Sequence, residues 1–128
     1  MEKTIAETLE MKHFAIFGAS NRKNSNGYKI FKKLHENGYK VYPISPRLVD
    51  IDGVRCFGTI EEIPFVPQVV CIATPAEICY DIVKGAYDHG VRRFWIEPES
   101  CSEESLAFIA RHELPAVCTE NLCDVLEA

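Results

Sequence analysis

The strongest constraint on the fold of this chain is a regular alternation of short apolar runs with amphipathic segments. Segments with helical spacing of apolar residues, at about residues 25–37, 75–89 and 102–112, separate the runs. This alternation is typical of a parallel sheet that is covered by helices on both faces. We therefore predict an α/β fold with a five-stranded, mostly parallel sheet. The five predicted strands are residues 14–18, 39–45, 67–74, 91–97 and 115–120.

The length of 128 residues is that of one domain. We expect residues 1–128 to form a single domain, with residues 1–11 as an N-terminal extension. The first residues, MEKTIAETLEMK, are charged and lack the apolar middle of a signal peptide, and no apolar run approaches the ~20 residues of a membrane helix. We expect a cytoplasmic protein without a membrane partner.

Charge is distributed unevenly along the chain. The formal net charge of -5 disfavours nucleic acid as a partner. Between Arg22 and Arg47 there are seven basic residues and one acid, whereas the chain after Phe65 has four basic residues and eleven acids. The lysines at 29, 32 and 33 fit a solvated helix face, while Arg22, Lys23 and Arg47 fall outside the helix at strand ends.

The residues that follow the predicted strands are the candidates for a binding site. In a parallel sheet of this kind, ligands bind outside the carboxyl ends of the strands, where the direction of the connections reverses. We expect four short segments to converge at that edge: Gly18–Asn21, Ser45–Arg47, Thr74–Glu77 and Glu97–Ser100.

The turn after the first strand, Gly18-Ala19-Ser20, indicates a close approach to the backbone. It does not match the dinucleotide motif G-x-G-x-x-G, because Ser20 and Lys23 occupy the positions of the later glycines, and no P-loop motif is present. A small-residue turn before a helix can still receive a phosphate, and Arg47 can take a second one. We expect a side chain at Gly18 to block the ligand and to leave the fold intact.

A longer stretch, IFGASNRKNSNGYKIFKKLHENGYKVYPISP, together with ENLC near the end, resembles a known family. It is similar to the small bacterial CoA-binding proteins, which are Rossmann-like domains related to the N-terminal domain of the succinyl-CoA synthetase alpha subunit. The resemblance implies a three-layer Rossmann-like fold and coenzyme A as the ligand. It places Gly18, Ala19, Ser20 and Asn21 at the pyrophosphate with Arg22 beside them, Pro46 and Arg47 at the adenosine end, and Thr74, Pro75 and Glu97 along the path to the pantetheine.

No set of side chains typical of a catalytic mechanism is apparent. We expect a stand-alone, non-catalytic module that binds CoA, an acyl-CoA or a related nucleotide, either as a homo-oligomer or with a separate enzyme partner. One alternative is an NAD(P)-binding, oxidoreductase-like domain in which Arg47 contacts a 2'-phosphate. Another is a scaffold subunit with a vestigial pocket.

Three types of titratable side chain leave further alternatives. The six cysteines include no C-x-x-C pair, so we expect reduced, mostly buried thiols, with Cys123 open as a reactive one. The four histidines have no second ligand at metal spacing, so no metal is expected. Glu97 is either a general base or a hydrogen-bonding group at a strand end.

Overall fold

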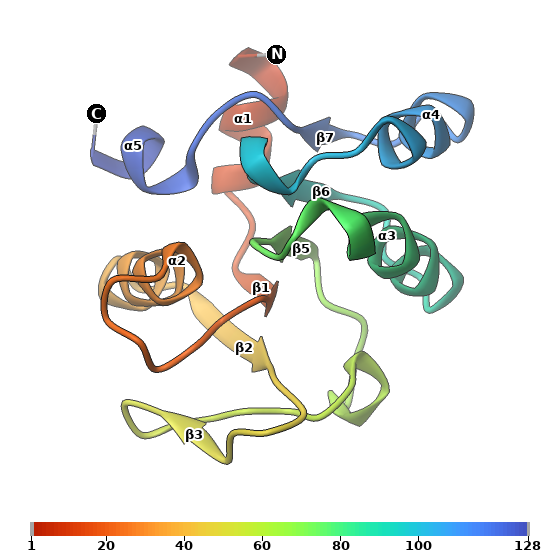
Figure 1. The fold of residues 1–128 in the computed structure, drawn as a ribbon. Helices are drawn as coiled ribbons and strands as arrows, with labels where there is room; N and C mark the ends of the chain where they lie inside the picture. The colour runs from red at the N-terminus through yellow and green to blue at the C-terminus, as the bar shows by residue number, and fades with distance from the viewer. Residues whose placement is uncertain (1, 128) are drawn as a thin grey trace.

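The sheet of the protein has five strands, all parallel. The computed structural model describes residues 2–127. The order across the sheet is β2-β1-β5-β6-β7, and each of the four pairings between neighbours is parallel (Figure 1). The α/β Rossmann-like prediction is therefore confirmed. The strands are β1 (His13–Phe17), β2 (Lys40–Ile44), β5 (Val69–Ile72), β6 (Phe94–Ile96) and β7 (Ala116–Val117).

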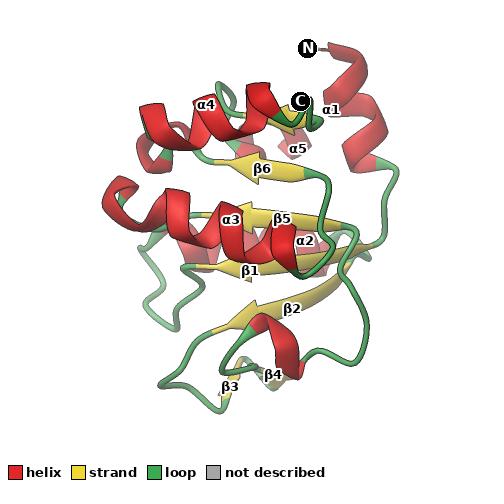
Figure 2. Cartoon of the chain, turned by 90° about the vertical axis from the view of Figure 1, so that its right-hand side faces the viewer, coloured by secondary structure: helices red, strands yellow, loops and turns green. Residues whose placement is uncertain are grey.

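Helices cover both faces of the sheet and give the expected three layers. Figure 2 shows α3 (Cys79–Asp88) and α4 (Glu103–Arg111) in front of the strands and α2 (Asn26–Glu36) behind them. The short α5 (Leu122–Glu127) packs beside α2, and α1 (Glu2–Leu9) packs beside β7.

Alternation along the strands divides the core into two layers. In β1, Phe14 and Ile16 are fully buried in the layer that includes Phe31 and Leu34 of α2. Ala15, between them, belongs to the opposite layer with α3 and α4. This is the period-two pattern of a strand buried on both faces, and it explains why the apolar runs are almost continuous.

Several boundaries differ from the sequence prediction. The predicted last strand of six residues is reduced to the two of β7, and a 3-10 turn at Ala76–Ile78 precedes α3. Between β2 and β5, residues 52–53 form the turn of a small hairpin of β3 (Asp50–Ile51) and β4 (Val54–Arg55), and residues 60–62 form a 3-10 turn. Helices α1 and α5 were not predicted, because eight and six residues are too few for a clear helical period.

The N-terminal segment is integrated with the domain through α1. Arg93 donates to Thr8 Oγ1 at 3.0 Å and lies 3.7 Å from the carboxylate of Glu7. Within residues 2–127, no helix is long and apolar enough to cross a bilayer.

Candidate functional site

The candidate site lies where the strand order reverses. From β1 the chain passes to β2 on one side and then to β5 on the other, so the switch point is between the carboxyl ends of β1 and β5. Figure 1 looks nearly along the strands at these ends. Because all strands are parallel, the turns that follow β1, β2, β5 and β6 meet at this edge, and the four predicted segments therefore converge there.

Gly18 is required by the backbone around it. Its φ of +92° lies in the left-handed region, and an added Cβ would stand 2.3 Å from the carbonyl oxygen of Ala73. A Cβ on Gly27, in the first turn of α2, would lie 1.9 Å from the carbonyl oxygen of Gly18. The close approach that the glycine turn indicates is thus one within the protein: the backbone of the turn after β1 lies against the end of β5 and against the first turn of α2. That a side chain at Gly18 leaves the fold intact stays a prediction, but these contacts show that such a side chain would also strain the turn.

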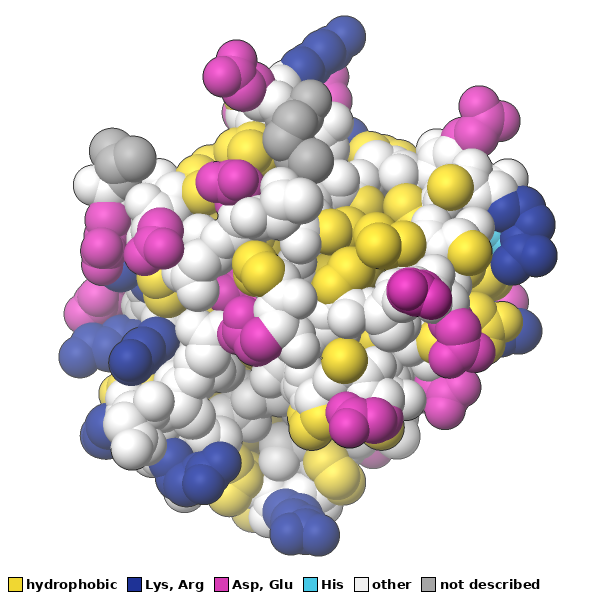
Figure 3. All heavy atoms as spheres, turned by 45° about the horizontal axis from the view of Figure 1, so that its top comes forward, with side chains coloured by type: hydrophobic (Ala, Val, Ile, Leu, Met, Phe, Trp, Pro, Cys, Tyr) yellow, Lys and Arg dark blue, Asp and Glu magenta, His cyan; other side chains and the backbone are white. Residues whose placement is uncertain are grey.

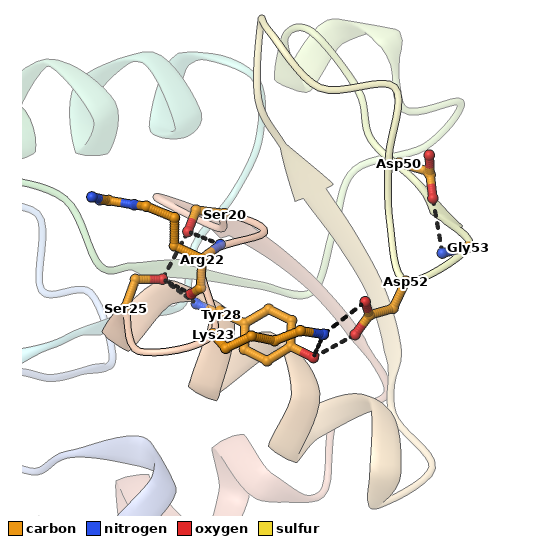
Figure 4. A network of polar contacts seen from close by, with 8 residues as sticks. All are labelled: Ser20, Arg22, Lys23, Ser25, Tyr28, Asp50, Asp52 and Gly53. Carbon is orange, nitrogen blue, oxygen red and sulfur yellow. Dashed lines mark hydrogen bonds and ion pairs between the residues drawn. The ribbon is translucent and has the colours of Figure 1, made fainter.

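The loop between β1 and α2 folds back onto the start of the helix. Ser25 is the N-cap of α2, and its Oγ accepts a hydrogen bond from Tyr28 N at 3.2 Å. The same oxygen donates to the carbonyl of Arg22 at 2.9 Å and lies 2.7 Å from Ser20 Oγ, which accepts from Arg22 N. These contacts fix the loop and leave Asn21 and Arg22 exposed at its tip (Figure 4).

Lys23 connects this loop to the β3–β4 hairpin. Its Nζ donates to Tyr28 OH at 2.8 Å and lies 3.3 Å from Asp52, and Tyr28 OH donates to Asp52 at 2.5 Å. The hydrogen bond from Tyr28 lowers the pKa of Asp52, and the bond to Tyr28 raises the pKa of Lys23. Figure 4 shows Lys23 extending toward the hairpin while Arg22 extends away from it.

The turn after β2 presents a second exposed arginine. Ser45 Oγ accepts hydrogen bonds from Arg47 N at 3.4 Å and Leu48 N at 3.3 Å, which shapes the turn around Pro46. Pro46 and Arg47 are exposed. Among residues 2–127, no carboxylate forms an ion pair with Arg22 or Arg47. The edge therefore carries two guanidinium groups that are available to an anion.

Glu97 is fully buried and accepts four hydrogen bonds. Its Oε1 accepts from Asn26 Nδ2 at 2.9 Å and Asn121 Nδ2 at 2.8 Å, and its Oε2 accepts from Trp95 Nε1 at 3.1 Å and Leu122 N at 2.9 Å. Burial raises the pKa of Glu97, and the bond from Asn26 opposes that shift. Of the two alternatives left by the sequence, the contacts match a hydrogen-bonding group that joins β6 to the starts of α2 and α5.

Three residues that the sequence analysis did not select belong to the same edge. Asn26 and Asn121 complete the network around Glu97, and Gly27 permits the close approach of α2. The sequence feature that could have selected Asn26 and Gly27 is their position directly after Ser25, which caps α2. Thr74 and Pro75 lie at the end of β5 as predicted, with Thr74 Cγ2 3.1 Å from where a Cβ of Gly18 would stand.

The thiols and histidines of residues 2–127 do not form a metal site. Cys71 and Cys79 are buried, as predicted, and Cys123 is partly exposed beside α2. Burial raises the pKa of the Cys123 thiol to about 11. No group of three metal-ligating side chains is found in the part of the chain that the structure describes.

The fold and the edge together define a class: a Rossmann-like domain with a tight glycine turn at its switch point. Comparison with known proteins identifies the family more closely. The sequence model of the CoA binding domain family matches residues 12–123, and the chain belongs to this family.

Relatives of the chain include larger proteins. The alpha subunit of an ADP-forming acetate–CoA ligase from Pyrococcus furiosus is 33% identical over 79 residues, which cover 61% of this chain and 17% of the ligase subunit. The chain thus spans less than a fifth of that relative's length.

Solved structures of small proteins match nearly end to end. A conserved hypothetical protein from Pyrococcus furiosus has a TM-score of 0.82 at 26% identity, covering 91% of this chain and 99% of that one. A hypothetical protein from Pyrococcus horikoshii has a TM-score of 0.90 at 23% identity, covering 98% and 89%. At 23% identity, the similarity to the Pyrococcus horikoshii protein shows a shared fold only.

Proposed function

We propose that the protein binds coenzyme A, or an acyl-CoA, across the carboxyl ends of its strands. The observation that carries this proposal is the loop of residues 18–25, which is fixed on the N-terminus of α2 at the switch point. Arg22 at its tip and Arg47 in the turn after β2 form no ion pair with a described carboxylate. A helix N-terminus favours negative charge, and its free N–H groups suit a phosphate. Membership of the CoA binding domain family supports the choice of CoA among phosphate-bearing ligands.

Each predicted residue has a role in this arrangement. The backbone of Gly18–Asn21 faces the pyrophosphate, with Arg22 beside it. Pro46 and Arg47 flank the adenosine end, where Arg47 pairs with the ribose 3'-phosphate. Thr74 and Pro75 lie along the pantetheine, while the buried Glu97 holds Asn26 and Asn121 in place behind it.

The module acts without chemistry of its own. Ser20, Lys23 and Ser25 hold the loops at this edge. Among the described residues, the buried carboxylate of Glu97 is saturated with hydrogen-bond donors. We propose that any CoA-dependent reaction takes place on an enzyme partner, because a domain similar to this one is part of an acetate–CoA ligase subunit.

The test compares CoA with dephospho-CoA, which lacks the 3'-phosphate. In calorimetric titrations, Arg47→Ala weakens CoA by about 1.5–3 kcal/mol, the range for a hydrogen bond to a charged group. Dephospho-CoA binds the wild type and this variant alike. Lys32→Ala is the control, because an exposed helix-face charge is screened within about 8 Å at physiological salt.

Three results would contradict the proposal. If Arg47→Ala weakens both ligands equally, the adenosine end does not lie at Arg47. If NADP binds more tightly than CoA, the site belongs to a nicotinamide cofactor, with Arg47 on its 2'-phosphate. If no nucleotide binds, the pocket is vestigial and the domain is a scaffold.

A further inference from the structure

Two partly exposed cysteines follow the last two strands of the sheet. Cys101 comes directly after the 3-10 turn η3 (Pro98–Ser100), in the connection from β6 to α4, and Cys118 comes directly after β7. Strands β6 and β7 are adjacent and parallel, so both connections leave the sheet at the same edge. Both cysteines are free and neither is fully buried, so a small reagent can reach them from solvent.

The alternation of side chains along β7 turns both thiols to the same face of the sheet. Val117 belongs to the core layer that packs against α2, whereas Ala116 and Cys118, on either side of it, pack against the opposite layer. Cys101 packs against that opposite layer too, and the fully buried Cys79 belongs to it. Three cysteines that are distant in the sequence are therefore on the face that α3 and α4 cover.

The side chains of Cys101 and Cys118 are in direct contact. Burial raises the pKa of the Cys118 thiol to about 12, and the charge of Cys101 and a hydrogen bond with it act in the same direction. Cys79 instead shares a hydrogen bond with Ser105 and is fully buried. Hydrophobic side chains, a class that includes cysteine in Figure 3, reach the surface right of the centre, on the side where Figure 1 places β7 and α4. Cys101 and Cys118 thus combine mutual contact with access to solvent.

We propose that Cys101 and Cys118 are a redox-active dithiol, which a small disulfide such as oxidised glutathione converts into an intramolecular disulfide. The inference is independent of CoA binding. In the first step the Cys101 thiolate attacks one sulfur of the glutathione disulfide, and one glutathione leaves as its thiolate. In the second step Cys118 loses its proton to water and attacks the Cys101 sulfur, which releases the second glutathione. The protein loses two hydrogen atoms, and one glutathione disulfide is reduced to two thiols.

The order of the two attacks follows from the surroundings of Cys118. With a pKa of about 12, about one Cys118 thiol in ten thousand is ionised at pH 8, so this thiol is a poor first nucleophile. Once Cys101 is part of the mixed disulfide it carries no negative charge, so one cause of the raised pKa of Cys118 is removed. Cys118 is therefore suited to the second attack.

The experiment treats the native protein with an excess of oxidised glutathione at pH 8 and records the intact mass and the tryptic peptides. We expect the mass to fall by that of two hydrogen atoms. Because trypsin cleaves after Arg111, which lies between the two cysteines, residues 94–111 should be linked to residues 112–128. A reductant should restore the original mass and separate the two peptides.

Three variants assign the linkage. Cys123→Ser is the matched control, because Cys123 shares a tryptic peptide with Cys118, and this variant should form the same link at the same rate. Cys118→Ser should stop at the mixed disulfide and gain the mass of one bound glutathione at Cys101. Cys101→Ser should react about tenfold more slowly than the wild type, because burial still raises the pKa of Cys118.

The peptide map of the wild type decides the pairing even if a variant does not fold. The proposal is refuted if the native wild type keeps all six thiols reduced, or if it accumulates as a mixed disulfide that does not close. A link between any other pair of peptides also refutes it. If Cys123→Ser abolishes the link, the partner of Cys101 is Cys123 and the assignment to Cys118 is wrong.

Discussion

The close packing of α2 against the β1–α2 turn allows one pair of substitutions to test the architecture of the site. Gly27 and Gly85 both lie within helices, but a Cβ on Gly27 would stand 1.9 Å from the carbonyl oxygen of Gly18, while a Cβ on Gly85 would meet nothing within 4 Å. The same change, glycine to alanine, is therefore expected to have opposite effects on stability.

The magnitudes follow from these contacts. An ordinary Cβ contact begins at 3.4 Å, so Gly27→Ala forces a shift of about 1.5 Å. Because the obstructing atoms are backbone, the loss lies toward the upper part of the range of about 1–3 kcal/mol for overpacking. Gly85→Ala gains about 0.5–1 kcal/mol from helix propensity. The two variants then differ by about 3 kcal/mol, or about 10 °C in Tm for a domain of this size.

Thermal and urea unfolding of both variants beside the wild type measure this difference. CoA titration follows for each variant that is folded at 25 °C, and Gly27→Ala is expected to bind more weakly because the loop of residues 18–25, the proposed phosphate site, is displaced. The reasoning is refuted if Gly27→Ala is as stable as Gly85→Ala, since the turn would then yield without cost.

Three further predictions concern the loop and its surroundings. Ser25→Ala removes the N-cap of α2 and is expected to lower stability by about 1 kcal/mol in urea unfolding; no change would mean that water replaces the cap. Because Tyr28 and Lys23 lower the pKa of Asp52 from 3.8, its contribution is present at neutral pH and is lost as pH falls through the folded pKa. The Tm advantage of the wild type over Asp52→Asn should therefore vanish on acidification, and an advantage that persists at pH 2 would contradict this. With the pKa of Cys123 raised to about 11, about one thiol in a thousand is ionised at pH 8, so iodoacetamide should label it slowly until the protein is unfolded; rapid labelling of the native protein would show an activated thiol.

The sequence by itself determined the class of fold and the sheet edge at which the candidate residues meet. Apolar periodicity is local, so strands β1, β2, β5 and β6 and helices α2 and α4 were predicted close to their observed places. The predicted helix at residues 25–37 agrees with α2, which Ser25 caps at its start. Parallel strands then bring their carboxyl ends together whatever the side chains are.

Only the tertiary structure decided what each side chain at that edge meets. Glu97 binds Asn121 and Asn26, which are 24 and 71 positions away in the chain, and Gly18 lies against the backbone of Ala73. No local pattern specifies such partners, because they are brought together by the order of strands in the sheet. Helices α1 and α5 are likewise held by packing of residues such as Ile5 and Leu122 against the core, since segments so short gain little stability from helix formation alone.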